Sequence, residues 1–311
     1  MRLLLNAAGI ALASIAICAS AVLISRSPSG ATSAPASCPQ RWGGAGIGDW
    51  VPQATGIDGA EASLVPGEPV AATICAYPGE NFRPGGERLA GARTLTGQAT
   101  AMARDLAYLP VTTGNRDSPC TAVGGPMTNY LIRFAYPGGQ AIWVGTAEEV
   151  NACVTTTNGT TTSEAYLGPS ITAAYRTGTW KVIRPDDPCD GPTQRRGQNE
   201  WMVPGRPVSV LVCGEAGSSG ARRPRAQHGR QAATSLAAAL NSPDTRPTDH
   251  TCQGGESTHS RVFHYLFGYA DGPPASVVVW IGCVPGLDNG LLQADVDDSI
   301  LNQAMRLTPR G

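Results

Sequence analysis

The side chains with the greatest chemical potential lie close together in the second half of the chain. The segment "DHTCQGGESTH" contains His250, Cys252 and His259. Imidazole and thiolate groups are ligands that Zn²⁺ prefers, so one interpretation is a metal site. We favour a cysteine in a disulfide with two loop histidines beside it, because the chain lacks the C-x-x-C pair that zinc ribbons need. We therefore predict no metal and no cofactor.

Histidine also permits hydrolytic chemistry. The members of a Ser-His-Asp site are not sequence neighbours, so a secreted hydrolase with a site near His250 or His259 stays open as the alternative function. Asp249 precedes His250, but adjacent residues seldom face one another. His264 precedes an aromatic strand, where we expect it to pack. No G-x-S-x-G, H-E-x-x-H, P-loop or G-x-G-x-x-G motif occurs, so we assign no catalytic residue.

Two charged clusters suggest binding rather than catalysis. One lies near the C-terminus and has four aspartates: Asp288, Asp295, Asp297 and Asp298. It lacks the spacing of a calcium loop, so we expect solvated charges and carboxylates at a helix N-terminus. The other is a predicted loop, "ARRPRAQHGR", with four arginines: Arg222, Arg223, Arg225 and Arg230. These arginines could contact an anionic envelope polymer or a partner's acidic face, although a solvated loop before a helix is the simpler interpretation.

The cysteines indicate a disulfide scaffold. Nine occur, and Cys18 lies inside an apolar N-terminal segment. An even number remains, which in an exported chain is typical of disulfides. The pairing that we favour closes two disulfides in each half: Cys38 with Cys75, Cys120 with Cys153, Cys189 with Cys213, and Cys252 with Cys283.

One phrase is written twice, as "LVPGEPVAATIC" from Leu64 and "MVPGRPVSVLVC" from Met202. Other features recur in the same order around both copies. They are a cysteine 12 residues before a tryptophan (Trp50, Trp201), an Ala-rich stretch, an F-x-Y pair, an Asn-Gly pair and a final helix. Asn158-Gly159-Thr160 also matches a glycosylation sequon, but we expect only a turn there. The shared order predicts a tandem duplication.

Within each copy the pattern is strand, helix, hairpin, helix. The apolar runs that end at Cys75 and Cys213 are rich in β-branched residues, which favours buried strands. Ala99–Leu109 and Arg230–Leu240 carry apolar residues on one helical face. The segment after Asn129 alternates and turns at "PGG", which indicates a hairpin. We therefore predict an α+β fold, with a small antiparallel sheet and one or two helices in each disulfide-bonded copy.

The N-terminus indicates the compartment. Residues 3–24 carry no charge and as a helix would extend about 33 Å, enough to cross a bilayer. A cleaved signal peptide is the alternative, with cleavage after Ala21. We divide the chain into a signal peptide or anchor (1–26), a flexible spacer (27–37), repeat 1 (38–177), a linker (178–188) and repeat 2 (189–311).

Composition narrows the function class. The formal net charge is −1, which gives no general attraction to nucleic acid. We predict an exported, membrane-tethered, non-catalytic bacterial envelope protein with a binding, sensing or structural role. Its expected partners are the membrane through residues 3–24, if this segment is uncleaved, and an envelope polymer or protein. The cleft between the two copies and the arginine loop are the first candidates for contact.

Overall fold

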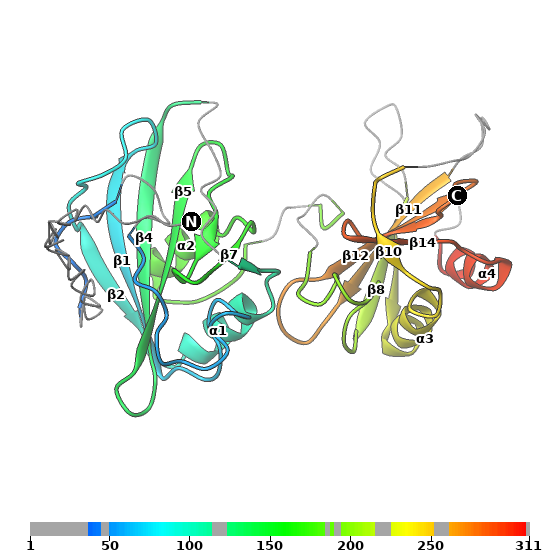
Figure 1. Cartoon of the computed structure of the whole chain (residues 1–311), viewed down its shortest axis with the longest axis horizontal. Coiled ribbons are helices and arrows are strands. Elements are labelled where there is room, and N and C mark those ends of the chain that lie inside the picture. Colours follow the sequence, from blue (N-terminus) through cyan, green and yellow to red (C-terminus); the bar gives the residue numbers. More distant parts are fainter. Residues whose placement is uncertain are drawn as a thin grey trace, which may run out of the picture. The chain divides into compact units, whose positions relative to one another are not determined.

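The computed structural model describes residues 37–44, 50–113, 123–183, 187–189, 194–214, 225–251 and 261–308. In these ranges the chain forms two antiparallel sheets and four helices, which confirms the predicted mixed α+β class (Figure 1). The predicted N-terminal apolar helix and spacer lie almost wholly outside the described residues. Among the helices that are described, none is long and apolar enough to span a membrane.

The first sheet has three long central strands: β1 (Ala71–Glu80), β4 (Pro126–Ala135) and β5 (Ala141–Glu149). Shorter strands extend it to the order β2-β1-β4-β5-β6-β7-β3, and these are β2 (Gly91–Leu95), β3 (Thr112–Thr113), β6 (Thr156–Thr157) and β7 (Thr161–Ser163). The predicted hairpin is confirmed, since Ala135 of β4 pairs with Ala141 of β5 across the "PGG" turn. Two helices follow the predicted positions: α1 (Ala99–Ala107) and α2 (Gly168–Thr177).

The second sheet repeats this order of elements. Its strands are β8 (Ser209–Cys213), β9 (Arg225–Gly229), β10 (Arg246–Pro247), β11 (Arg261–Gly268), β12 (Ala275–Ile281), β13 (Leu287–Asp288) and β14 (Leu292–Ala294). They are arranged β9-β8-β11-β12-β13-β14-β10, so each strand has a counterpart at the same place in the first sheet. Its helices are α3 (Arg230–Leu240) and α4 (Asp298–Leu307).

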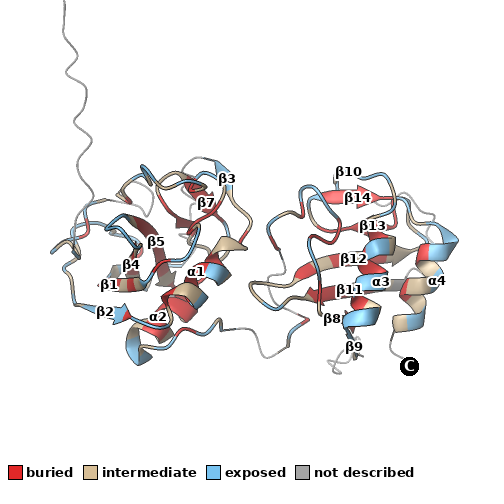
Figure 2. Cartoon of the chain, turned by 90° about the horizontal axis from the view of Figure 1, so that it is seen from below, coloured by how far each residue is buried: buried red, intermediate tan, exposed pale blue. Residues whose placement is uncertain are grey.

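The helices of each half pack on one face of their own sheet. In the first half the buried face of α1, with Met102 and Leu106, meets strand residues such as Ile74 and Phe134. The second half builds the same arrangement from α3, α4 and the buried face of β8, β11 and β12. Figure 2 shows these buried stripes on the strands and on the helix faces that meet them. Burial of such apolar side chains is the main stabilising contribution in each half.

Each sheet carries a disulfide on the face that its helices do not cover. The described residues hold Cys38–Cys75 and Cys189–Cys213, with Cα atoms 5.8 and 6.1 Å apart. Both have the pairing expected from the sequence. Cys153 and Cys283 are also disulfide-bonded. The cysteines that we expected to pair with them, Cys120 and Cys252, lie outside the described residues.

The predicted equivalence of Trp50 and Trp201 is wrong. Trp50 packs against Trp42, with ring centroids 4.7 Å apart, in the aromatic cluster beside the first disulfide. Trp201 is instead 54% exposed. The reason is a length difference between the halves, since Cys38 precedes Val65 by 27 positions and Cys189 precedes Val203 by only 14. Equal spacing from the cysteine therefore does not give an equal place in the fold.

A buried asparagine ties the segment before the first strand to the sheet. Asn158, in the turn between β6 and β7, is fully buried, and its Nδ2 donates to the carbonyls of Ala60, Ser63 and Leu64 at 2.8, 3.0 and 3.4 Å. Its Oδ1 accepts from the backbone N–H groups of residues 160 and 161. The expected turn is present, but the side chain is inaccessible to a glycan and has a structural role instead.

The second half contains the same arrangement. Asn289 donates to the carbonyls of Gln198, Trp201 and Met202 at 2.9, 3.1 and 3.3 Å. Its Oδ1 accepts from the N–H groups of residues 291 and 292. Each acceptor carbonyl lies 138 positions after its counterpart in the first half, which is also the spacing of the repeated phrase. This contact therefore identifies equivalent positions in the two halves. The residue of the first half that corresponds to Trp201 is Ser63.

A tyrosine fixes each Pro-Gly turn. Tyr136 donates its hydroxyl to the carbonyl of Pro66, and Tyr269 donates to that of Pro204, both at 2.6 Å. The glycine that follows each proline has a positive φ, 70° at Gly67 and 69° at Gly205. Glycine adopts this left-handed conformation without steric cost, which explains the Pro-Gly pair. The F-x-Y pairs therefore supply a hydrogen-bond donor as well as core volume.

The edge strands β2 and β9 were not expected, and neither were the short strands β3, β6, β7, β10, β13 and β14. β2 and β9 have the sequences GARTL and RAQHG, which carry few apolar residues and lack the pattern of a buried strand. Each pairs with only one long strand and lies at a sheet edge. Backbone hydrogen bonds to that neighbour, rather than side-chain burial, keep these segments extended. The predicted arginine loop is therefore wrong for residues 225–229, which form β9.

The buried asparagines give the first testable prediction. Replacing Asn289 with Ala leaves three carbonyls and two N–H groups without their partner, so we expect the free energy of unfolding to fall by about 2–4 kcal/mol. Urea unfolding followed by tryptophan fluorescence measures this loss. Asn199→Ala, at an exposed position close to Gln198, is the matched control and should change stability by less than about 0.5 kcal/mol. Equal effects of the two changes would contradict the role of Asn289.

Tyr136 gives a prediction about pH. Burial raises the pKa of its phenol to about 12, whereas an unfolded tyrosine ionises near pH 10. The folded state then holds the proton more tightly, so the stability from the neutral phenol is complete below pH 10 and is lost as pH rises towards 12. Tyr136→Phe should lower stability by about 1 kcal/mol at pH 7 and flatten the decline between pH 10 and 12. Urea unfolding at each pH checks this, and an unchanged slope would refute it.

Candidate functional site

His250 is the histidine on which the hydrolase alternative depends. It follows β10, and its side chain is 68% exposed. Its Nδ1 lies 3.6 Å from the carboxylate of Asp288 and 3.5 Å from the hydroxyl of Thr248. Both neighbours approach the same ring nitrogen, whereas a nucleophile–histidine–acid arrangement needs one partner on each nitrogen. The described residues therefore assemble no such site around His250.

The other histidines have different surroundings. His228 lies on β9 and donates from Nε2 to the carbonyl of Leu307 at 2.8 Å, which ties the strand to the end of α4. His264 lies on β11, paired with Cys213 of β8 and Val278 of β12. His259 and Cys252 fall outside the described residues. Within the described ranges, no three histidine, cysteine, aspartate or glutamate side chains gather closely enough to hold a metal ion.

The C-terminal aspartates have structural partners. Asp297 is the N-cap of α4 and accepts from the N–H of Ile300 at 2.8 Å, which confirms the expected helix N-terminal carboxylate. Asp288 is buried, and it accepts from the hydroxyl of Thr248 and from the N–H of Gly290. Asp295 lies 3.5 Å from a guanidinium nitrogen of Arg246. These contacts give structural partners to three of the four aspartates, and Asp298 lies in the first turn of α4.

The predicted arginine site is only partly described. Arg222 and Arg223 lie outside the described residues. Arg225 begins β9, is half-buried, and its guanidinium lies 3.6 Å from the carboxylate of Asp187. Arg230 is exposed at the first position of α3. Arg225 and Arg230 thus sit on regular elements, and the pairing of Arg225 reduces the charge that it can offer to a partner.

Arg195, in the second half, contacts a tyrosine of each half. Arg195 lies between the rings of Tyr108 and Tyr269, with its guanidinium carbon 3.9 and 3.8 Å from the ring centroids. Its Nη1 donates to the carbonyls of Asp271 and Pro273 at 2.7 and 2.8 Å. Burial lowers the pKa of this guanidinium, but the ordinary value is so high that the charge persists. Arg195 is thus a stacked structural cation.

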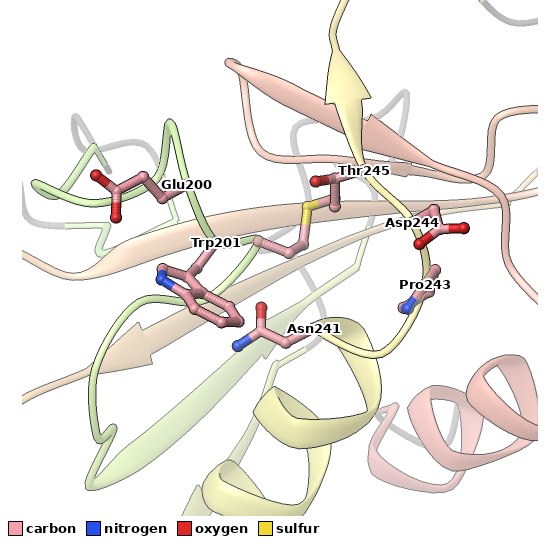
Figure 3. Close-up of a pocket in the computed structure, with 7 residues that line it drawn as sticks. Glu200, Trp201, Asn241, Pro243, Asp244 and Thr245 are labelled. Atoms are coloured by element: carbon pink, nitrogen blue, oxygen red, sulfur yellow. The ribbon is translucent and has the colours of Figure 1, made fainter.

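The second half also contains a pocket, whereas the polar clusters described above are occupied by contacts within the chain. Its volume is about 470 Å³, and its lining consists of Glu200, Trp201, Met202, Asn241, Pro243, Asp244 and Thr245. The loop before β8 supplies the first three residues, and the end of α3 with the loop after it supplies the rest. Figure 3 shows the indole of Trp201 between the two carboxylate residues, with Glu200 on one side and Asp244 on the other.

The pocket wall is built on the buried asparagine contacts. Asn289 holds the carbonyls of Trp201 and Met202, so this part of the loop is fixed to the sheet. Met202 is fully buried, whereas the side chain beside it, Trp201, is exposed. Asn241 closes the α3 side through hydrogen bonds of 2.8 and 2.7 Å to the backbone N–H and C=O of Val203. A fixed backbone therefore presents an exposed aromatic ring at the pocket.

The first half lacks this feature at the equivalent position. Ser63, which occupies the place of Trp201, is only 4% exposed. The two scaffolds share their topology, asparagine contact and Pro-Gly turn, so the difference lies in the surface that each loop presents. Spacing from the preceding cysteine made Trp201 look like the counterpart of Trp50, and for this reason the sequence did not single it out. A count of positions from the repeated phrase would have aligned it with Ser63.

A second pocket, of about 310 Å³, shares Pro243 with the first. Its lining consists of Ser242, Pro243, Asp295, Val296, Asp297 and Ile300. Its two carboxylates are those already used by Arg246 and by the N-terminus of α4. In the Trp201 pocket, by contrast, neither Glu200 nor Asp244 takes part in an ion pair or side-chain hydrogen bond with another described residue. The Trp201 pocket is therefore the better candidate for binding.

Comparisons with known proteins give no relative from which a function could be transferred. No family model matches the chain, and neither a curated protein nor a solved structure is significantly similar to it. The chemistry of the described residues therefore carries the functional interpretation.

Proposed function

We propose that this chain is an exported, membrane-tethered, non-catalytic envelope protein built by tandem duplication, and that its second half binds a ligand in the Trp201 pocket. The observation that carries the binding role is the exposed Trp201 at a position where the first half buries Ser63. In a duplicated scaffold, a tryptophan that is more than half exposed where its counterpart is buried is a candidate for binding, because tryptophan is enriched at binding hot spots.

The two sheets support the duplication. Their strand orders match element by element, and the helices follow the same strands. Each half also carries a buried asparagine whose side chain donates to backbone carbonyls. The carbonyls that Asn289 contacts lie 138 positions after those that Asn158 contacts. Unrelated α+β domains would have no physical reason to share such a specific contact at the same spacing. The proposed repeats keep the boundaries expected from the sequence, 38–177 and 189–311.

The cysteines and the N-terminal segment support export. Disulfide-bonded cysteines persist in oxidising compartments and are rare in a reducing cytoplasm. Residues 3–24 are long enough to cross a bilayer and carry no charge. The proposal places the described part of the chain outside the cytoplasm, with the spacer 27–37 as a flexible tether.

A non-catalytic role agrees with the observed contacts. His228 donates to a backbone carbonyl, and the hydroxyl and carboxylate beside His250 both approach the same ring nitrogen. Among the described carboxylates of the second half, Asp271, Asp288, Asp295 and Asp297 have structural partners, whereas Glu200 and Asp244 border the Trp201 pocket. Two exposed carboxylates beside an aromatic ring provide binding groups, but no paired acid and base of the kind that hydrolysis needs.

Export is tested with the full-length chain carrying a C-terminal epitope tag in a bacterial host. We expect the protein in the membrane fraction. Protease added to cells whose cell envelope has been permeabilised should degrade it. Its migration in a denaturing gel should differ between samples prepared with and without reductant. Deletion of residues 3–24 should leave a cytoplasmic, protease-protected and reduced chain. Tagged protein in the medium would replace the anchor with a cleaved signal peptide, and cytoplasmic full-length protein would refute export.

The pocket is tested by ¹⁹F NMR of the full-length chain labelled with 5-fluorotryptophan. Trp201→Phe identifies the resonance of Trp201. The probes are an N-acetylglucosamine oligomer, an aspartate oligopeptide and a lysine oligopeptide, each at millimolar concentration. We expect at least one of them to shift the resonance of Trp201 and to leave those of the buried Trp42 and Trp143 unchanged. If none shifts it, the binding role of this pocket is rejected.

A further inference from the structure

We propose that the Trp201 pocket binds a basic segment of a partner protein, with an arginine or lysine side chain against the indole and the carboxylates of Glu200 and Asp244 as counter-charges. This inference rests on the proposed binding role of the same pocket and names the chemistry of its ligand.

The first support is the charge of the lining. Glu200 and Asp244 are the charged residues among the seven that line the pocket, and both are exposed acids. Arg246, two positions after Asp244, is directed to Asp295 at 3.5 Å, and the nearest arginines before and after Glu200 in sequence, Arg196 and Arg206, do not line the pocket. The charge of the lining is therefore negative. A cationic ligand gains from both carboxylates, whereas an anionic one is repelled.

The second support is that the charged groups of the lining are hydrogen-bond acceptors. Asn241 is the amide in the lining, and both ends of its side chain are bonded to Val203. Pro243 has no N–H, and ionised carboxylates only accept. The other side-chain donors of the lining are the indole N–H of Trp201 and the hydroxyl of Thr245, so the ionised carboxylate acceptors are its strongest polar groups. Ammonium and guanidinium groups only donate, so they match the lining.

The third support is the exposed aromatic ring. Trp201 is 54% exposed, and tryptophan attracts a cation over its ring face more strongly than tyrosine or phenylalanine does. The chain already uses this interaction, since Arg195 stacks on Tyr269 with 3.8 Å between guanidinium carbon and ring centroid. In that internal case the cation is permanent. At Trp201 the ring lies beside carboxylates and is available to an external one.

A peptide fits the shape better than a small cation does. A buried organic cation is usually enclosed by several aromatic rings, whereas this pocket has one ring and an open side formed by exposed residues. Glu200 and Asp244 stand at opposite ends, with Trp201 and Asn241 between them (Figure 3). An extended segment with more than one basic side chain can reach both carboxylates, so we assign the site to a basic peptide.

The test titrates the labelled full-length chain with a blocked five-residue peptide that carries two arginines, and with its counterpart in which neutral citrulline replaces both. We expect the arginine peptide to shift the resonance of Trp201 and to bind at least about 5-fold more tightly than the citrulline peptide. Its affinity should fall as salt concentration rises, because exposed charges are screened.

Variants separate the contributions. Trp201→Ala should weaken binding of the arginine peptide about 10-fold, and Glu200→Gln and Asp244→Asn about 3-fold each, measured by isothermal titration calorimetry. Phe82→Ala is the matched control for an exposed aromatic ring, since Phe82 is also 54% exposed and lies in the first half. Asp295→Asn is the control for a nearby carboxylate that is already paired. Neither control should change the affinity, and thermal melting verifies that all variants fold.

The outcomes distinguish this inference from the proposed function. Equal affinity for the arginine and citrulline peptides, or no shift with either, overturns the basic-peptide assignment. If the glycan oligomer still shifts the resonance of Trp201, the pocket binds a ligand of another class and the proposed function stands. If no probe shifts it, both proposals fail. Arginine-dependent binding that Trp201→Ala weakens in the calorimetric titration, and that Phe82→Ala retains, supports both.

Discussion

A buried amide that fills its hydrogen-bonding capacity is the constraint on which each half of the structure depends. Asn158 and Asn289 each hold three carbonyls of the irregular segment that enters the first long strand. That segment has no regular partner of its own, so its backbone groups would be unsatisfied in the core without this amide. Once the segment is fixed, the Pro-Gly turn, the long strand and the disulfide at its end follow in a set geometry.

The same constraint explains how two similar scaffolds can present different surfaces. The asparagine bonds to backbone atoms, so the side chains of the held segment are free to differ. At one such position the first half has Ser63, which is buried, and the second half has the exposed Trp201. The longer stretch after Cys38 adds Trp42 and Trp50 to the far face of the first sheet, where they cover Tyr77. The second half is shorter there, and its exposed aromatic residue lies beside carboxylates instead.

The proposed binding role follows from which polar groups are already engaged. The second half contains many acids and several histidines, and most of those described have a structural partner: a helix N-terminus for Asp297, a guanidinium for Asp295 and a carbonyl for His228. Glu200 and Asp244 remain exposed at a pocket whose central ring is also exposed. A group that has no role in folding is available for recognition, and an acceptor-rich pocket with one aromatic face favours a cationic partner.

The sequence by itself determined the class of fold, the helices, the central hairpin and two disulfides, because apolar periodicity, turn chemistry and the order of cysteines are local signals. It missed the short strands β3, β6, β7, β10, β13 and β14 as well as β2 and β9, whose extended form depends on a neighbouring strand rather than on their own residues. It also predicted the turn at Asn158 but not the hydrogen bonds that the buried side chain makes. In addition, it aligned Trp201 with Trp50 instead of Ser63. Only the tertiary structure decided these points, because burial and hydrogen-bond partners depend on segments up to about a hundred residues away that spacing along the chain does not reveal.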